Sequence, residues 1–333
     1  MNEKALQILE QYEIGLQRSF GGRGGIMLET EQGLKMLKEF AGSRARLPFE
    51  QKLLEVLEQQ GVCRTDRAVP NREGELVTVG EYEVPYLVKN WPPGRECDPR
   101  NEEELLRSMR TLARIHRTAR GLWHTQGEER RWLQGCDRCG ELERHNREMK
   151  RARNYIRGRQ KKGEFELLYL RCAEELFREG QRALELLVKA GGQSLYQRAS
   201  REEHICHGEY IHHNILMNRQ ETAVVNFGHF EINAQVQDIS LFLRKIMEKQ
   251  SWNGRLAARM LTAYEKELPL SGEERICLAA NLYYPEKAWK LIHHYYHTNK
   301  AWVPEKSAEK LKVFLAQTEM RKTMLRELFE LPV

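Results

Sequence analysis

The segment HGEYIHHNIL, residues 207–216, carries the residue types with the clearest chemistry in this sequence. It has a carboxylate, Glu209, at its third position and an amide, Asn214, five residues later. Transfer of a phosphoryl group from a nucleotide uses such a carboxylate as general base and such an amide as a metal ligand. His207 and Glu209 are therefore the candidate catalytic residues.

A second polar position follows twelve residues after Asn214. Asn226 stands after the apolar run in TAVVNFG, residues 222–228, where a phosphotransfer site needs its main magnesium ligand. Magnesium prefers anionic oxygen ligands. Because Asn214 and Asn226 are both neutral, we expect them to be weak ligands and Mg²⁺ not to be held firmly. Asp238, in VQDISLFLR, is predicted near a helix start, as an N-cap or as a brace for the backbone of the catalytic loop.

The N-terminal part offers residues that could hold a nucleotide. The turn GGRGG lies between two predicted strands, and Gly22 and Gly24 would let backbone N–H groups approach phosphates, although an ordinary hairpin turn has the same composition. Lys38, on the next strand, and Glu50, at the start of a helix, are predicted to form an ion pair aimed at the α and β phosphates of ATP. Lys35 is the alternative lysine, and either could simply be solvated.

Hydrophobic periodicity predicts the elements that position these residues. Three antiparallel strands are expected over residues 13–40, a helix over 49–61 and two more strands over 75–91. Helices are expected over 102–120, over 141–190 with an interruption near Gly163, and over 255–331, with short strands within 205–232. The fold class is α+β, with a β-rich lobe over 1–92 that contains one helix and a mainly helical lobe over 93–333 that carries the catalytic-like loop.

Several segments together resemble the CotS-type spore coat proteins, a kinase-like family within the aminoglycoside phosphotransferase and choline kinase superfamily. The segments are TEQGLKMLK (30–38), NWPPGREC (90–97), LARIH (112–116), HGEYIHHNIL, VVNFGHFEINAQVQDISLFLRK (224–245) and YYPEKAWKLIHHYYHTNKAWVPEK (283–306). The resemblance implies a bilobal protein-kinase-like fold, a site for ATP, a place in the spore coat and other coat proteins as partners.

The sequence departs from active relatives at two positions where the resemblance implies an aspartate. Glu209 and Asn226 stand where the resemblance implies an aspartate base and a magnesium-binding aspartate. Glutamate moves the charge by roughly a bond length, and a displacement near 1 Å can cost on the order of 10²-fold in rate. We therefore favour a coat structural or assembly protein that is a pseudokinase with a degraded metal site. The alternative is an ATP-dependent phosphotransferase acting on a small hydroxylated molecule.

A third hypothesis is an anion-binding or partner-binding module. The tract 144–162 holds nine Lys and Arg against Glu148 alone, a local charge of +8, whereas the whole chain has a net charge of +6. Such a tract can bind polyanions or acidic proteins, or can be a solvated helix face. Without interleaved aromatic residues, protein partners are favoured over nucleic acid.

Two clusters have the composition of metal sites. CDRC holds Cys136 and Cys139 at a zinc spacing, but no second pair follows, so thiols at a helix start are favoured. His293 and His297 would share a helix face, but two ligands are too few, and packing with Tyr295, Tyr296 and Trp302 is favoured.

Neither a signal peptide nor a run of about 18 apolar residues is present, which predicts synthesis in the cytoplasm and no membrane association. Seven cysteines are too sparse for a disulfide framework.

Overall fold

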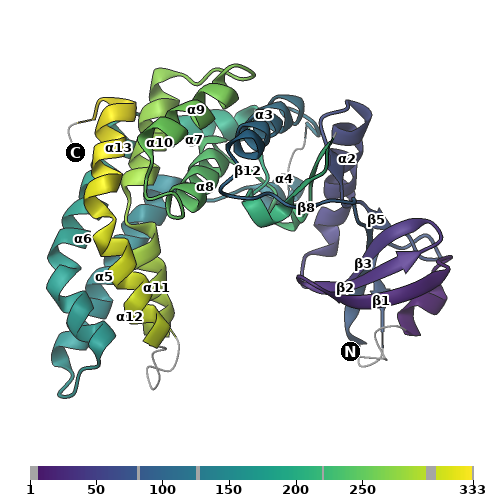
Figure 1. Cartoon of the computed structure of the whole chain (residues 1–333), viewed down its shortest axis with the longest axis horizontal. Coiled ribbons are helices and arrows are strands. Elements are labelled where there is room, and N and C mark those ends of the chain that lie inside the picture. The colour runs from purple at the N-terminus through teal and green to yellow at the C-terminus, as the bar shows by residue number, and fades with distance from the viewer. Residues whose placement is uncertain (1–6, 81–82, 125–127, 220, 298–304, 332–333) are drawn as a thin grey trace. The chain divides into compact units, whose positions relative to one another are not determined.

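The chain folds into two compact units, each built from two separate segments (Figure 1). The computed structural model describes residues 7–80, 83–124, 128–219, 221–297 and 305–331. The first unit comprises residues up to 134 together with 207–231, and the second comprises 135–206 together with 232–333. The units therefore do not divide at residue 92, and the lobes 1–92 and 93–333 stay a prediction.

The first unit contains the sheets. Its strands are β1 (Leu16–Gly22), β2 (Gly25–Thr30), β3 (Gly33–Glu39), β4 (Arg64–Thr65), β5 (Ala68–Val69), β6 (Thr78–Val79), β7 (Pro85–Asn90), β8 (Arg95–Glu96), β10 (Ile215–Met217) and β11 (Thr222–Val224). One sheet has the order β1-β2-β3-β7-β5, with β6 also paired to β7, and the other has the order β4-β11-β10-β8. The three strands predicted over 13–40 are confirmed.

Two helices of the first unit, α2 and α3, were predicted from apolar spacing, and the unit also contains short helical segments that were not predicted. They are η1 (Gln7–Gln11), η2 (Arg44–Arg46), α2 (Leu47–Gln59), α3 (Glu102–Thr118), α4 (Glu128–Leu133), η4 (His212–Asn214) and η5 (Phe227–His229). In α2, Leu53, Leu54 and Leu57 are fully buried, and the chain leaves the helix through Gly61 at φ 63°. The Asn101 side chain caps α3 by accepting the backbone N–H of Glu104.

A small core lies on one face of the first sheet. It joins Ile8 and Tyr12 of the N-terminal segment to Leu28, Leu37 and Val88 of the central strands. Because side chains alternate along a strand, Lys38 on β3 and Lys89 on β7 must face the other side of the sheet, away from this core. The apolar alternation thus places two lysines on the face opposite this core.

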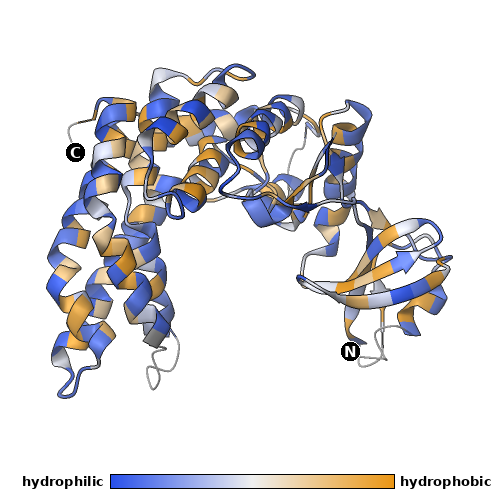
Figure 2. Cartoon of the chain, in the orientation of Figure 1, coloured by the Kyte–Doolittle hydropathy of each residue, from blue (hydrophilic) through white to orange (hydrophobic). Residues whose placement is uncertain are grey.

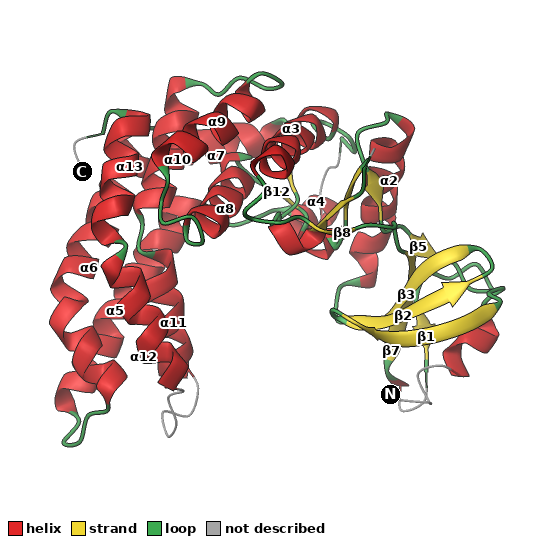
Figure 3. Cartoon of the chain, viewed as in Figure 1, coloured by secondary structure: helices red, strands yellow, loops and turns green. Residues whose placement is uncertain are grey.

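The second unit is mainly helical (Figure 3). Its helices are α5 (Arg138–Gly158), α6 (Glu164–Lys189), α7 (Gly192–Arg201), α8 (Val236–Met247), α9 (Gly254–Glu265), α10 (Gly272–Tyr283), α11 (Glu286–His297), α12 (Glu305–Ala316) and α13 (Thr318–Phe329). The strand β9 (Ile205–Cys206) belongs to it, and β12 (Glu231–Ile232) spans the junction of the units. The interruption predicted near Gly163 is confirmed, since Gly163 is the N-cap of α6.

Amphipathic helices build the core of the second unit. Figure 2 shows apolar and polar residues mixed along each of these helices. Ser271 and Glu274 form a capping box at the start of α10, and Asp137 caps α5. Within the described residues, no helix combines the length and the apolar character that crossing a bilayer demands.

Candidate functional site

The catalytic-like loop is built around His207, whose side chain is almost fully buried. Its Nδ1 accepts the backbone N–H of Glu209 at 3.1 Å, and its Nε2 lies 3.1 Å from the carbonyl oxygen of Val225. A carbonyl only accepts, so the proton resides on Nε2 and the imidazole is neutral. The ring also packs on Phe227, with centroids 4.3 Å apart. His207 therefore positions the loop, and both of its ring nitrogens are engaged in doing so.

Gly208 fixes the direction in which the loop leaves His207. Its φ is +78°, and a Cβ at this position would lie 2.1 Å from the carbonyl oxygen of His229. Only glycine fits both conditions. The next side chain, Glu209, is 46% exposed, and its Oε2 lies 4.0 Å from Nε2 of His229. The candidate base is thus open to solvent.

Asn214 and Asn226 are bonded to each other. The Nδ2 group of Asn226 donates to Oδ1 of Asn214 at 3.0 Å, and the Nδ2 group of Asn214 donates to the carbonyl oxygen of Glu209 at 2.9 Å. Lys38 donates from Nζ to Oδ1 of Asn226 at 3.3 Å. Oδ1 of Asn214 and Oδ1 of Asn226, the two amide oxygens that could bind a metal, therefore already accept hydrogen bonds.

This donor set does not fit magnesium. Neither amide oxygen is anionic, and an ammonium group shares the site, whereas Mg²⁺ demands nearly octahedral coordination by hard, preferably anionic, oxygens. The amide hydrogens of Asn226 instead join the loop to the strand end through a neutral hydrogen bond.

The parallel pairing of β4 with β11 brings Asn226 to the site. Val224 lies opposite Thr65 in this pairing, so the residues that follow each strand emerge side by side. Asn226 adopts a left-handed conformation at φ 65°, which asparagine tolerates better than most residues, and its backbone N–H donates to Oδ2 of Asp66 at 3.0 Å. Asp66 thus holds the backbone at this position.

Asp66 belongs to a buried charge cluster with Lys89 and Glu50. The Nζ group of Lys89 lies 2.8 Å from Oε1 of Glu50 and 3.0 Å from Oδ2 of Asp66, and all three side chains are at most 5% exposed. Burial alone would lower the pKa of Lys89, but the two carboxylates outweigh burial and raise it. Lys89 is therefore the cation that compensates both buried carboxylates.

The predicted ion pair between Lys38 and Glu50 is replaced by this cluster. Glu50 pairs with Lys89 of β7, because a buried carboxylate needs an equally buried cation and Lys38 is only half-buried. Burial lowers the pKa of Lys38, and the charge of Lys89 lowers it further, against the opposing carboxylates of Asp66 and Glu50. Lys38 reaches Asn226 instead.

The alternative lysine and the glycine turn lie elsewhere in the first unit. Lys35 faces the other side of β3 and donates to Oδ1 of Asn90 at 2.8 Å. Gly22 pairs with Gly25 across a two-residue turn, in which Gly24 has φ 80°. Arg23 lies between Gly22 and Gly24 in this turn, and its Nε atom is 3.2 Å from Oε1 of Glu96.

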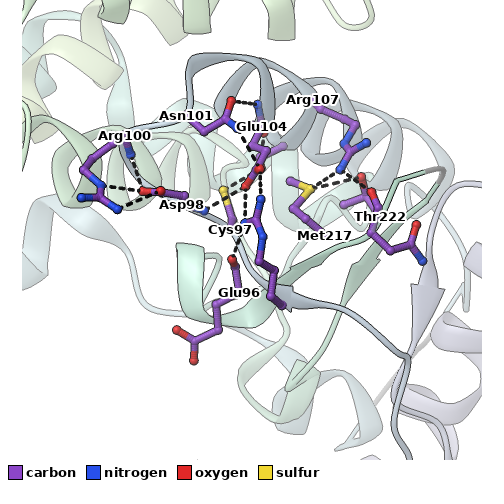
Figure 4. Close-up of polar contacts among 12 residues, drawn as sticks. Glu96, Cys97, Asp98, Arg100, Asn101, Glu104, Arg107, Met217 and Thr222 are labelled. Carbon is purple, nitrogen blue, oxygen red and sulfur yellow. Dashed lines mark hydrogen bonds and ion pairs between the residues drawn. The ribbon is translucent and has the colours of Figure 1, made fainter.

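Glu96 connects the turn to the catalytic-like loop, because its other oxygen pairs with Nδ1 of His213. The position of Glu96 depends on the pairing of β8 with β10 and on Glu104, whose carboxylate accepts from Arg95 and from the backbone N–H of Asp98 (Figure 4). The guanidinium of Arg95 lowers the pKa of Glu104. The start of α3 thus anchors the strand that carries Glu96.

Asp238 lies in the second unit, as the third residue of α8, and is buried. Its predicted position near a helix start is confirmed, but the N-cap of that helix is Gln235, so the N-cap alternative for Asp238 was wrong by three residues. Its part as a brace for the catalytic loop stays a prediction.

Two residues of the site were missed in the sequence. Lys89 sits in the apolar strand PYLVKN and Asp66 follows a two-residue strand, so neither belongs to a recognisable motif. A signal was present for Lys89: a lysine inside an apolar strand must be exposed at an edge or paired with a buried acid. Nothing in the local sequence identified the acid.

The cysteine pair CDRC lies at the start of α5. Cys136 is exposed, and Cys139 is buried in the first turn, where its backbone N–H donates to the capping carboxylate of Asp137 at 3.1 Å. Burial raises the pKa of the Cys139 thiol to about 11. Among the described residues, the group of three or more potential metal ligands is Glu148, His293 and His297, which excludes both cysteines.

The basic tract covers most of α5 and the turn that follows it. Much of its charge is paired with acidic residues on α5 and α6. The pairs with acidic residues outside the tract are Arg144 with Glu141, Arg147 with Glu143, Arg153 with Glu174, and Arg159 with Glu166. The local +8 counted along the sequence is therefore partly compensated in the fold.

Comparison with known proteins gives a match over nearly the whole chain. A family model described as "Spore coat putative kinase YutH" matches residues 5–328. This span includes the loop at 207–214, Asn226 and the buried lysine cluster.

Solved structures with the same fold are phosphotransferases. An aminoglycoside phosphotransferase from Alicyclobacillus acidocaldarius matches with a TM-score of 0.85 at 20% identity, covering 98% of this chain and 95% of that one. A spectinomycin phosphotransferase in complex with ADP and spectinomycin matches with a TM-score of 0.66 at 12% identity, over 97% of both chains. Choline kinase from Streptococcus pneumoniae matches with a TM-score of 0.52 at 12% identity, over 96% and 97%. The bilobal kinase-like fold is thereby shown.

Proposed function

This chain belongs to the spore coat kinase-like YutH family, and we propose that it is a structural or assembly protein of the coat built on a kinase scaffold that has lost its metal site. In this proposal the scaffold supplies shape and surface to the coat. The phosphotransfer site survives as a hydrogen-bonded framework.

The hydrogen bond between Asn226 and Asn214 supports this proposal most directly. In a working site of this class, two neighbouring oxygens would be bridged by a divalent cation. Here Asn226 donates a hydrogen bond to Oδ1 of Asn214, and the ammonium of Lys38 donates a hydrogen bond to Oδ1 of Asn226. The framework is therefore complete without an ion, and an entering cation would have to break both bonds.

A calorimetric titration with ATP tests the loss of the metal site. The purified chain is titrated once with excess magnesium and once with EDTA. We expect the two isotherms to coincide, whatever the affinity for ATP is. A magnesium-dependent gain of tenfold or more would contradict the proposal, since it requires an ion held between protein and phosphates.

A slow phosphotransferase is the second candidate, and the exposure of Glu209 favours it. The carboxylate is 46% exposed and therefore able to accept a proton from a small hydroxylated substrate. Phosphate release from ATP in the presence of a panel of amino alcohols and sugars tests this candidate. Turnover that disappears in both Glu209→Ala and Asn226→Ala would establish it, and would end the pseudokinase proposal.

For coat partners, we propose the exposed part of the basic tract as the contact surface. Arg147 and Arg157 are exposed, and Arg151 also points to solvent. An acidic coat protein would bind there through charge, with a salt-dependent affinity. Reversing Arg151 and Arg157 to glutamate should weaken binding to coat extracts and its salt dependence, and unchanged binding would contradict this assignment.

A further inference from the structure

Helices α5 and α11 of the second unit bring together three side chains that the proposed function does not use. Glu148 lies on α5, and His293 and His297 lie one turn apart on α11. The two helices pack side by side in the second unit (Figure 1). The histidine pair is visible in the sequence, but the carboxylate is 145 residues away from His293 along the chain.

The three side chains converge closely. One potential ligand atom from each lies within 4.8 Å of the other two. Oε2 of Glu148 is 3.0 Å from Nδ1 of His293, and the rings of His293 and His297 have centroids 4.2 Å apart. A tetrahedral ion with bonds of about 2.0–2.2 Å needs its ligands about 3.3–3.5 Å apart, so small side-chain rotations would suffice.

A second layer of contacts orients the carboxylate. Nε1 of Trp289, one turn before His293, donates to Oε2 of Glu148 at 2.9 Å. Ligand residues in metal sites are commonly fixed by such outer hydrogen bonds.

We propose that Glu148, His293 and His297 bind one zinc ion, with water at the fourth position. Two imidazoles and one carboxylate suit a borderline divalent ion, and imidazole nitrogen disfavours Mg²⁺ and Ca²⁺. In the loaded site, the ion takes the place of the proton between Oε2 of Glu148 and Nδ1 of His293, and the neutral imidazole carries its proton on Nε2. The proposal is independent of any activity at Glu209.

The surrounding charge sets a limit on the affinity. Nη1 of Arg144 lies 3.8 Å from Oε1 of Glu148, so a cation already stands beside the carboxylate. It faces the oxygen that does not contact His293, which leaves Oε2 for the ion. With three ligands and a neighbouring arginine, the site should bind zinc more weakly than a closed four-ligand structural site does.

Zinc at this position would cross-link the two helices. Glu148 lies in the middle of α5 and His297 is the last residue of α11. The ion would therefore fasten the end of α11 to its neighbour and stabilise the second unit against unfolding.

The experiment uses the full chain, freed of metal with a chelator and then titrated with Zn²⁺ in competition with a chromophoric chelator. We expect one ion per chain and a rise in melting temperature on addition of zinc. Substitution with Co²⁺ should give the visible absorption of a tetrahedral site.

Four variants make the test specific. His297→Ala, His293→Ala and Glu148→Gln should each weaken zinc binding at least tenfold and abolish the thermal shift. The matched control is His294→Ala, an exposed histidine adjacent to His293 that is not one of the three ligands. His297 is also exposed, so its replacement should leave the fold and the melting temperature without zinc unchanged.

The proposal is overturned if the wild-type chain binds no zinc in the competition assay. It is equally overturned if His297→Ala and Glu148→Gln bind as tightly as His294→Ala, because the ion would then be held by other residues.

Discussion

Asn226 donates a hydrogen bond from Nδ2 to Oδ1 of Asn214 at 3.0 Å, and this bond joins the residue that follows β11 to the catalytic-like loop. Under the proposed function, this bond takes the place of a metal ion between the two side chains. Asn226, where the family resemblance implies an aspartate, would then be held by its neighbour Asn214.

Restoring the aspartate should restore metal dependence. In Asn226→Asp, the new carboxylate faces Oδ1 of Asn214 without a proton between them, so the chain alone should lose about 1–2 kcal/mol of stability. Magnesium with ATP should raise the melting temperature of the variant and leave that of the wild type unchanged. Differential scanning fluorimetry measures both, and a variant insensitive to magnesium would show that more than residue 226 is missing.

Removing the buried cation should be costly. Lys89→Met leaves Glu50 and Asp66 buried without a counter-charge, and we expect a loss of about 3–5 kcal/mol in the free energy of unfolding. The matched control is Lys35→Met on the adjacent strand, which removes one hydrogen bond to Asn90 and should cost about 1 kcal/mol. Urea denaturation compares the two, and equal losses would contradict a special role for Lys89.

Two glycines with similar backbone angles should respond differently to alanine. Gly208 and Gly24 have φ of +78° and +80°, but only at Gly208 would a Cβ collide with backbone, the carbonyl of His229. Gly24→Ala should cost about 1 kcal/mol of strain. Gly208→Ala must also move the loop, so it should cost more and should alter the accessibility of Glu209, which hydrogen exchange over residues 207–214 can follow.

The pH dependence of stability should report on Glu286. Burial would raise the pKa of Glu286, but Arg138, 2.8 Å away, outweighs burial and lowers it from 4.5 to about 2. The folded state therefore binds fewer protons than the unfolded state between these values, and stability falls as pH falls from 4.5 toward 2. The contribution is about 3 kcal/mol above pH 4.5.

Glu286→Gln isolates this contribution. The variant should be less stable than the wild type at pH 6, and the difference should shrink steadily as the pH approaches 2. Chemical denaturation at several pH values measures it, and a difference that does not depend on pH would contradict the assignment.

Local patterns were sufficient for the longer strands and helices. The alternation around Leu28 and Leu37 predicted the strands of the first sheet, the glycine at 163 predicted the break between two long helices, and the spacing in HGEYIHHN predicted the loop. Each of these signals lies within a few residues of the feature that it predicts.

Partners distant along the chain could not be predicted in the same way. Glu50 could have paired with either lysine on this face of the sheet, and in the fold Lys89 is as deeply buried as Glu50 whereas Lys38 is only half-buried. The carboxylate of Glu148 beside the histidines of α11 depends likewise on how two helices pack. Register and packing are properties of the folded chain, which explains why the ion pairs and ligand sets were missed, as were the short elements β4, β5, β8, α4 and α7.

The interleaving of the two units has a consequence for biosynthesis. The pairing of Thr65 with Val224 joins residues made early by the ribosome to residues made long afterwards, with all of the helices α5 to α7 translated in between. Until residue 231 has left the ribosomal exit tunnel, the carboxylate of Asp66 cannot accept its hydrogen bond from the backbone N–H of Asn226. The first unit can therefore complete its fold only after residues 207–231 have been synthesised.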